Sequence, residues 1–160
     1  MKFTLVKDLR EDALMRPLLS GLMLFSGAFL VADVFLKRDH IGLDRRTLSD
    51  TLYGNEAEFV EPVSEHFLLE LLHSDIFFMM MTLLTLSAVY ARLSPSKRLA
   101  ALLINVSMLA AVADVVLLAL SFYRGSGYLL PWLGAFWTWH AAALYMAAAS
   151  FVNLNVLGRR

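Results

Sequence analysis

The sequence of 160 residues contains no cysteine. Disulfides, thiolate metal sites, iron–sulfur clusters and a cysteine nucleophile are therefore excluded. Neither sign of charge is in excess, because 14 Lys and Arg residues balance 14 Asp and Glu residues. The composition lacks the basic footprint of a nucleic-acid-binding protein, so we expect no nucleic acid partner. Any functional site must be built from histidine, carboxylate, hydroxyl and aromatic side chains.

Charged residues are scarce as a class. They make up 18% of the chain, against about 25% in ordinary soluble domains, while 59% of the residues are hydrophobic. The charges also cluster between long apolar runs. This distribution excludes a soluble globular protein and a disordered chain, and it indicates a protein embedded in the lipid bilayer.

Four segments are long and apolar enough to cross a bilayer, which takes roughly 20 residues of helix. They are residues 17–36, 66–90, 99–122 and 129–157. The sequences LSPSK and YRGSGY, which join the second, third and fourth segments, are short and force antiparallel neighbours. The predicted fold class is an all-α integral membrane protein, a single domain over residues 1–160 that forms an up-down-up-down four-helix transmembrane bundle.

The Lys and Arg residues predict the orientation. Nine fall on one side of the membrane: Lys2, Lys7, Arg10, Arg16, Arg92, Lys97, Arg98, Arg159 and Arg160. Five fall on the other: Lys37, Arg38, Arg45, Arg46 and Arg124. The positive-inside rule therefore predicts a multi-pass protein of the cell inner membrane with both termini in the cytoplasm. Residues 1–16 are expected to form an amphipathic segment at the cytoplasmic surface, and residues 37–65 an outer loop, part of which can lie on the membrane.

Ionisable residues inside membrane spans are rare and are candidates for function. Here they are Asp33, Glu70, His73, Asp75, Asp114 and His140, with His66 at a span end. Counted from the outer span ends at about 1.5 Å per residue, Asp33 lies about 5 Å deep and His73 about 10 Å deep. The same count places Asp114 at about 12 Å and His140 at about 16 Å. All four spans thus place an ionisable group in the outer half of the bilayer.

One interpretation of these groups is a non-covalent haem b. His73 and His140 lie at similar depths and would be its axial ligands, with Trp137 one turn from His140 against the porphyrin. Glu70 and Asp114 would hold the imidazole tautomers or handle protons, and Asp33 and Asp75 would complete the second shell. The histidine pair resembles the axial ligands of small membrane-embedded b-type cytochromes. This interpretation needs the second and fourth spans to face each other across the bundle.

A second interpretation is a non-haem metal site. Glu70 and His73 have the Glu-x-x-His spacing of carboxylate-bridged di-iron bundles, and His66 lies on the same helix face. Asp114 and His140 would complete the ligand set, which suits Fe, Mn or Zn. Against this interpretation, the sequence has no second Glu-x-x-His motif.

A third interpretation requires no cofactor. A His–Asp pair between helices can act as a hydrogen-bonded clamp in an accessory subunit of a larger complex, and a relay of Asp, Glu and His can carry protons. Two local pairings are also expected: Asp33 can pair with Lys37 one turn further on, and Asp75 can pair with Arg124.

The function that we predict from the sequence is electron transfer by a haem protein, between the quinone pool and a partner subunit. A chain this small needs either a homo-oligomer or a partner membrane subunit to complete an electron circuit. Whether it is part of an oxidoreductase stays open at this point.

Overall fold

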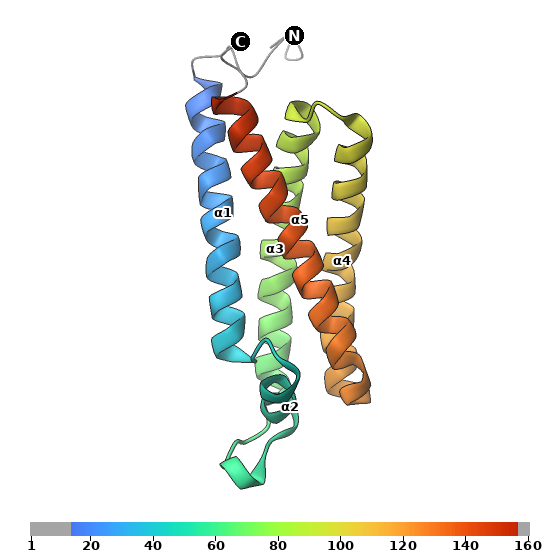
Figure 1. Cartoon of the computed structure of the whole chain (residues 1–160). Coiled ribbons are helices and arrows are strands. Elements are labelled where there is room, and N and C mark those ends of the chain that lie inside the picture. Colours follow the sequence, from blue (N-terminus) through green and yellow to red (C-terminus); the bar gives the residue numbers. More distant parts are fainter. Residues whose placement is uncertain (1–13, 157–160) are drawn as a thin grey trace.

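The computed structural model describes residues 14–156, and within this range it consists of helices without a β-sheet. The four long helices are α1 (Met15–His40), α3 (Glu65–Leu93), α4 (Lys97–Arg124) and α5 (Leu129–Asn155). Three short ones lie in the connections: α2 (Arg45–Tyr53), η1 (Glu56–Glu58) and η2 (Ser126–Tyr128). The long helices run alternately up and down (Figure 1). The predicted all-α membrane fold is confirmed, with α2 as an additional fifth α-helix.

Helices α1, α3 and α4 are each long and apolar enough to span a membrane. α5 has 27 residues, among them three tryptophans and His140, and it is not one of the three helices that meet this condition of length and composition. Ser64 and Ser96 cap the starts of α3 and α4, because their hydroxyls accept hydrogen bonds from the backbone N–H groups of Phe67 and Leu99. The predicted segment 1–16 lies almost entirely outside the described residues, as does residue 157 at the end of the fourth predicted span.

Helix α5 crosses the bundle diagonally, from α1 at one end to α4 at the other (Figure 1). It contacts α1, α3 and α4, whereas α1 packs much less closely on α3. At the end where α1 begins, the side-chain amide of Asn155 donates to Ser20 Oγ at 2.9 Å, and Arg16 donates to the Asn155 carbonyl at 3.3 Å. α3 and α5, the second and fourth predicted spans, are thus in direct contact.

The segment predicted as the outer loop, residues 37–65, is largely helical. α1 continues to His40, and α2 then folds over the end of the bundle as a cap (Figure 1). Leu48 and Leu52 of α2 are buried in a cluster with Leu68 and Trp132, so they contact the bundle instead of the membrane surface. The Tyr53 hydroxyl donates to the Ser121 carbonyl at 2.6 Å and fixes the cap on α4. We refer to residues 41–64 as the cap.

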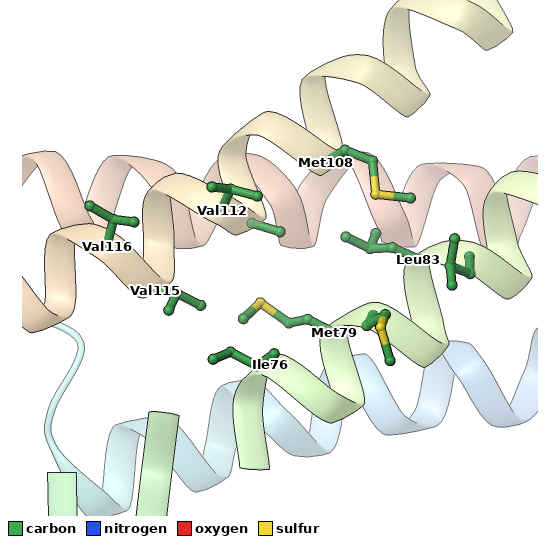
Figure 2. A pocket seen from close by; sticks show the side chains of 10 residues that line it. Ile76, Met79, Leu83, Met108, Val112, Val115 and Val116 are labelled. Atoms are coloured by element: carbon green, nitrogen blue, oxygen red, sulfur yellow. The ribbon is translucent and has the colours of Figure 1, made fainter. Parts of the chain in front are cut away.

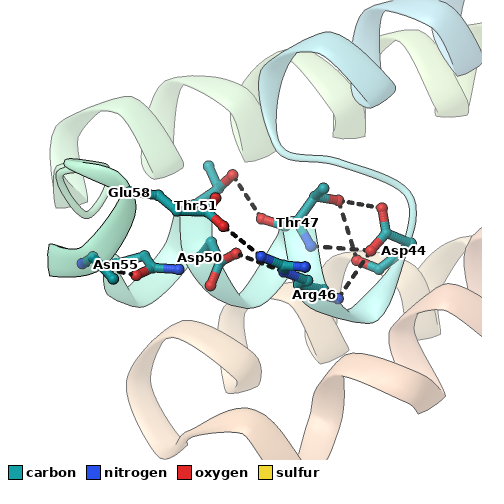
Figure 3. A network of polar contacts seen from close by, with 8 residues as sticks. Asp44, Arg46, Thr47, Asp50, Thr51, Asn55 and Glu58 are labelled. Carbon is teal, nitrogen blue, oxygen red and sulfur yellow. Dashed lines mark hydrogen bonds and ion pairs between the residues drawn. The ribbon is translucent and has the colours of Figure 1, made fainter.

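Polar contacts organise the cap from within (Figure 3). Asp44 caps α2 by accepting hydrogen bonds at 3.0 Å from the backbone N–H groups of Arg46 and Thr47. Arg46 also forms an ion pair with Glu58. Gly42 precedes this turn with φ +82°, and a Cβ there would lie 2.2 Å from Thr47 Oγ1. The cap is therefore a folded element with its own hydrogen bonds.

The outer surface of the bundle is strongly apolar. Large exposed side chains such as Phe25, Phe35 and Leu109 project from the long helices. Between α3 and α4 an apolar groove of about 340 Å³ opens, with Met79, Leu83 and Met108 among its lining residues (Figure 2). An apolar surface of this extent is typical of helices embedded in a membrane, and these helices contact the lipid bilayer.

Candidate functional site

Five ionisable side chains gather in one cluster in the half of the bundle near the cap. Its five members are Asp33 and Lys37 of α1, Asp75 of α3, Asp114 of α4 and His140 of α5. Asp33 and Lys37 are four residues apart and therefore project from the same face of α1. Every long helix contributes at least one of the five, which we call the charged cluster.

Lys37 brings a buried ammonium group into the cluster. Its side chain is 3% exposed and forms an ion pair with Asp75, which is 13% exposed. Sequence reasoning placed Lys37 in the outer loop and named Arg124 as a partner of Asp75. That placement was wrong, because α1 extends four residues beyond the predicted span and carries Lys37 into the bundle. The i, i+4 spacing of Asp33 and Lys37 was the signal that could have found it.

His140 is 1% exposed and uses both ring nitrogens. Nδ1 lies 3.0 Å from the Phe136 carbonyl oxygen one turn earlier in α5, and Nε2 lies 3.0 Å from Asp33 Oδ2. The imidazole also packs against Trp139 and Phe136, with ring centroids 3.7 Å and 4.1 Å away. Asp33, predicted for the second shell, is thus the acid that contacts His140.

Asp114 completes the cluster from α4. It is 3% exposed, and its Oδ1 atom is buried without a hydrogen-bond partner among residues 14–156. The same holds for the indole Nε1 of Trp139. Both residues line a small cavity of about 10 Å³ together with Asp33, Lys37 and Asp75. Two unsatisfied polar atoms therefore share one small cavity with Asp33 and with the Lys37–Asp75 ion pair.

A larger groove of about 490 Å³ leads from the cap end of the bundle to the cluster. It lies between α1 and α3, which pack less closely on each other than either packs on α5. Its charged lining residues are Asp33, Lys37, Glu70 and Asp75, with His40 also on its wall. The cluster is thus reachable from the surface of the bundle along this groove.

The remaining predicted site residues lie apart from the cluster. His66, Glu70 and His73 share an exposed face of α3, and only Glu70 also lines the groove. Trp137 is 48% exposed and does not pack on His140, whose aromatic neighbours are Trp139 and Phe136. His73 and His140 are not brought together, because the former is exposed on α3 and the latter is buried on α5.

The described residues contain no group of three or more His, Asp or Glu side chains arranged to hold a metal ion. The Glu70–His73 pair belongs to the exposed face of α3, whereas Asp114 and His140 are buried. The structure therefore separates the ligands that the metal interpretation grouped.

The fold and the charged cluster define a helical integral membrane protein with ionisable groups inside its bundle. Residues 42–158 match the family Aq_1264_TM, described as a transmembrane helical domain, and the chain belongs to this family. The match includes Asp75, Asp114 and His140, and it begins after α1, which carries Asp33 and Lys37. No curated protein and no solved structure is significantly similar to the chain.

Proposed function

We propose that the protein is a membrane subunit whose charged cluster holds and exchanges protons on one side of the bilayer, in the service of a larger membrane complex. The observation that carries the proposal is the contact between His140 Nε2 and Asp33 Oδ2 at 3.0 Å. It also rests on the groove that reaches Asp33 from the cap end.

The two contacts of His140 require a proton between the imidazole and Asp33. A carbonyl oxygen only accepts hydrogen bonds, so the contact with Phe136 fixes the hydrogen on Nδ1. Nε2 then either donates to an ionised Asp33 as part of an imidazolium or accepts from a protonated Asp33. In both forms the pair holds one proton. Loss of this proton would place the Nε2 lone pair next to a carboxylate oxygen, and the repulsion between them would break the contact.

The small cavity could extend the hydrogen-bonded chain from Asp33 to Asp114. Its volume of about 10 Å³ is room for about one water molecule. A water there would donate to Asp114 Oδ1 and accept from Trp139 Nε1–H, which satisfies both atoms. It would also link Asp114 to the pairs formed by Asp33 and Lys37. Three carboxylates from three helices would then share a short hydrogen-bonded chain.

Proton exchange is expected toward the cap end only. In the other half of the bundle the buried polar residues within residues 14–156 are Ser87, Ser94, Ser107, Ser150 and Asn153, none of which carries an exchangeable charge. We place the protein in the cell inner membrane, with the termini in the cytoplasm and the cap outside. The cluster would then serve a partner subunit that takes up or releases protons on the outer side, as reactions of the quinone pool do.

The test is nitrogen NMR of protein labelled with ¹⁵N-histidine in lipid nanodiscs, followed from acid to alkaline pH. His140 is assigned by comparison with His140→Gln. We expect its Nδ1 to stay protonated and its Nε2 signal to report a proton shared with Asp33. In Asp33→Asn the side-chain amide replaces that proton as the donor to Nε2, so the pH dependence of this signal should be lost.

Asp39→Asn is the matched control, because Asp39 is an exposed carboxylate of the same helix. It should leave the His140 signal and its pH dependence unchanged. The proposal would be refuted by an unprotonated Nδ1, or by an Nε2 signal whose pH dependence is the same in Asp33→Asn as in the unchanged protein.

The haem function stays a second proposal, supported by one observation. His140 is a buried imidazole packed between the rings of Trp139 and Phe136, which is a suitable environment for a flat aromatic cofactor. Iron ligation through Nε2 would require His140 to release Asp33, and His73 would have to come from a rotated α3 or a second copy of the chain. Haem b, or Fe, Mn or Zn at the exposed face of α3, thus remains a prediction that spectroscopy and metal analysis can test.

A further inference from the structure

The groove between α1 and α3 has the features of a ligand site beside the charged cluster. Its volume of about 490 Å³ falls within the range typical of small-molecule pockets, about 300–1,000 Å³. It is bounded by aromatic rings at both ends. His40 and Phe67 make an edge-to-face contact near the cap, with centroids 6.0 Å apart, and Phe29 and Phe78 meet deeper in the bundle at 5.6 Å.

The charges that line the groove do not cancel. Lys37 is compensated by Asp75, and Asp33 contacts His140 Nε2, with which it shares a proton in the proposed function. Glu70 has no hydrogen bond or ion pair among the described residues, and its side chain is exposed on the groove wall. The groove thus carries one uncompensated negative charge among aromatic walls. Both features attract a cation, because aromatic faces are themselves negative.

Unpaired anions are costly beside a membrane interior, which makes an occupant of opposite charge favourable. The same groove is apolar at Leu36 and Leu71, so a small hydrated metal ion would leave these walls uncovered. The apolar part of a larger organic ion would cover these walls. We infer that the groove binds a monovalent organic cation with an apolar body, its charge against Glu70 and its body against Phe29, Phe67 and Phe78.

This inference deepens the proposed function, since the groove is the path by which the charged cluster meets its surroundings. The ligand chemistry has two sources: the ammonium headgroup of a lipid or a free amphiphilic cation. A neutral ring compound such as a quinone would use the same walls without Glu70. Dependence on the charge of Glu70 therefore separates the cation from a neutral ligand.

The experiment measures equilibrium binding of radiolabelled tetraphenylphosphonium to the purified full chain in detergent. We expect saturable binding at one site per chain. Glu70→Gln should weaken it by about tenfold, the effect of one partly desolvated charge pair. Phe78→Leu keeps the apolar volume but removes the ring, and should weaken binding by about threefold. Glu70 is exposed, so its substitution leaves the packing of the bundle intact.

Asp39→Asn is the control for general surface charge, since Asp39 is exposed near the end of α1 and does not line the groove. It should bind like the unchanged protein. Equal weakening by Asp39→Asn and Glu70→Gln would overturn the inference. So would the absence of saturable binding, or equal binding of the neutral analogue triphenylphosphine oxide.

Nanodiscs identify the source of the cation. If phosphatidylethanolamine, added to phosphatidylglycerol nanodiscs, displaces the probe, the occupant is a lipid headgroup. If it does not, the occupant is a free cation, and both results support a cation site. The NMR measurement of His140 uses no ligand, so a failure of probe binding leaves the proton proposal standing.

Discussion

Lys37 and Asp75 show how the protein accommodates charge inside a bundle of apolar helices. Removing either ion from water costs several kcal/mol in an interior of low polarity, and the pair recovers this cost only through close contact. The two side chains are 3% and 13% exposed. The pair therefore contributes little net stability beside an apolar pair of the same size, but each partner depends strongly on the other.

Lys37→Met tests this dependence. The substitution keeps the length of the side chain and leaves Asp75 without its cation, so we expect a loss of about 3 kcal/mol in the free energy of unfolding. Unfolding in mixed micelles with increasing SDS, followed by circular dichroism, measures it.

The double variant Lys37→Met with Asp75→Leu is the matched comparison. It removes both charges and should restore most of the lost stability, because no unpaired ion remains. If the double variant is as unstable as Lys37→Met alone, the loss comes from packing, and the unpaired charge of Asp75 is not its cause.

His73 and Asp75 illustrate the limit of prediction for single residues. They are two positions apart and point to nearly opposite sides of α3. The sequence prediction turned His73 inward, and the structure instead buries the Asp75 side and exposes His73. In a soluble helix the apolar side would have identified the interior. Here both sides are apolar because one faces lipid, so the pattern of hydrophobic residues carried no such information.

At the scale of elements, the cap shows how a polar segment becomes ordered at a membrane surface. Asp44 begins α2, and the pKa of its carboxyl is held below the ordinary value of 3.8 by hydrogen bonds from the Thr47 hydroxyl and from the Thr47 and Arg46 backbone N–H groups. An acid with a lowered pKa binds fewer protons in the folded state than in the unfolded state. Its stabilising effect is complete above 3.8 and is lost as the pH falls through the lowered value.

We therefore expect the start of α2 to loosen in acid. Amide hydrogen exchange of Arg46 and Thr47 should accelerate as the pH falls below 3.8, beyond the intrinsic pH dependence of exchange. Thr47→Val removes the largest cause of the low pKa of Asp44, so in this variant the loosening should begin at higher pH. Identical pH profiles for the two proteins would contradict the assignment.

Helix α1 differs from the other long helices in how it is held. The family match begins at residue 42, so α1 lies outside it. Its buried residues are Met23, Leu30 and Lys37. Asp33 binds α1 to α5 through its contact with His140, and Lys37 binds α1 to α3 through its ion pair with Asp75. Polar contacts within apolar surroundings thus set the position of a helix that buries little surface of its own.

At the scale of the whole molecule, the charged cluster lies in one half of the bundle, and the proposed function therefore has protons exchanged with one side of the membrane. The deciding experiment about its chemistry is the absorption spectrum of the purified protein, oxidised and then reduced with dithionite, with metal analysis of the same sample. The proposal that protons are exchanged by side chains alone predicts no Soret band and no stoichiometric metal.

A Soret band that sharpens and shifts on reduction would instead establish the haem function. His140→Ala and His73→Ala should then each abolish haem retention, while His66→Ala should not. Stoichiometric Fe, Mn or Zn without a Soret band would favour the metal site, and Glu70→Ala and Asp114→Ala should then lose the metal. Each outcome selects one of the three interpretations.

The sequence by itself determined the all-α membrane fold and the four long helices, because runs of about 20 apolar residues have few alternatives to a membrane helix. It also determined that ionisable groups from all four lie in one half of the bundle, since depth follows from counting residues along a helix. Only the tertiary structure decided which groups meet. The rotation of each helix and the diagonal course of α5 bring Asp33 to His140 and Lys37 to Asp75, and leave His73 outside. Helix rotation depends on packing between apolar surfaces that resemble lipid-facing ones, and a single sequence does not distinguish the two.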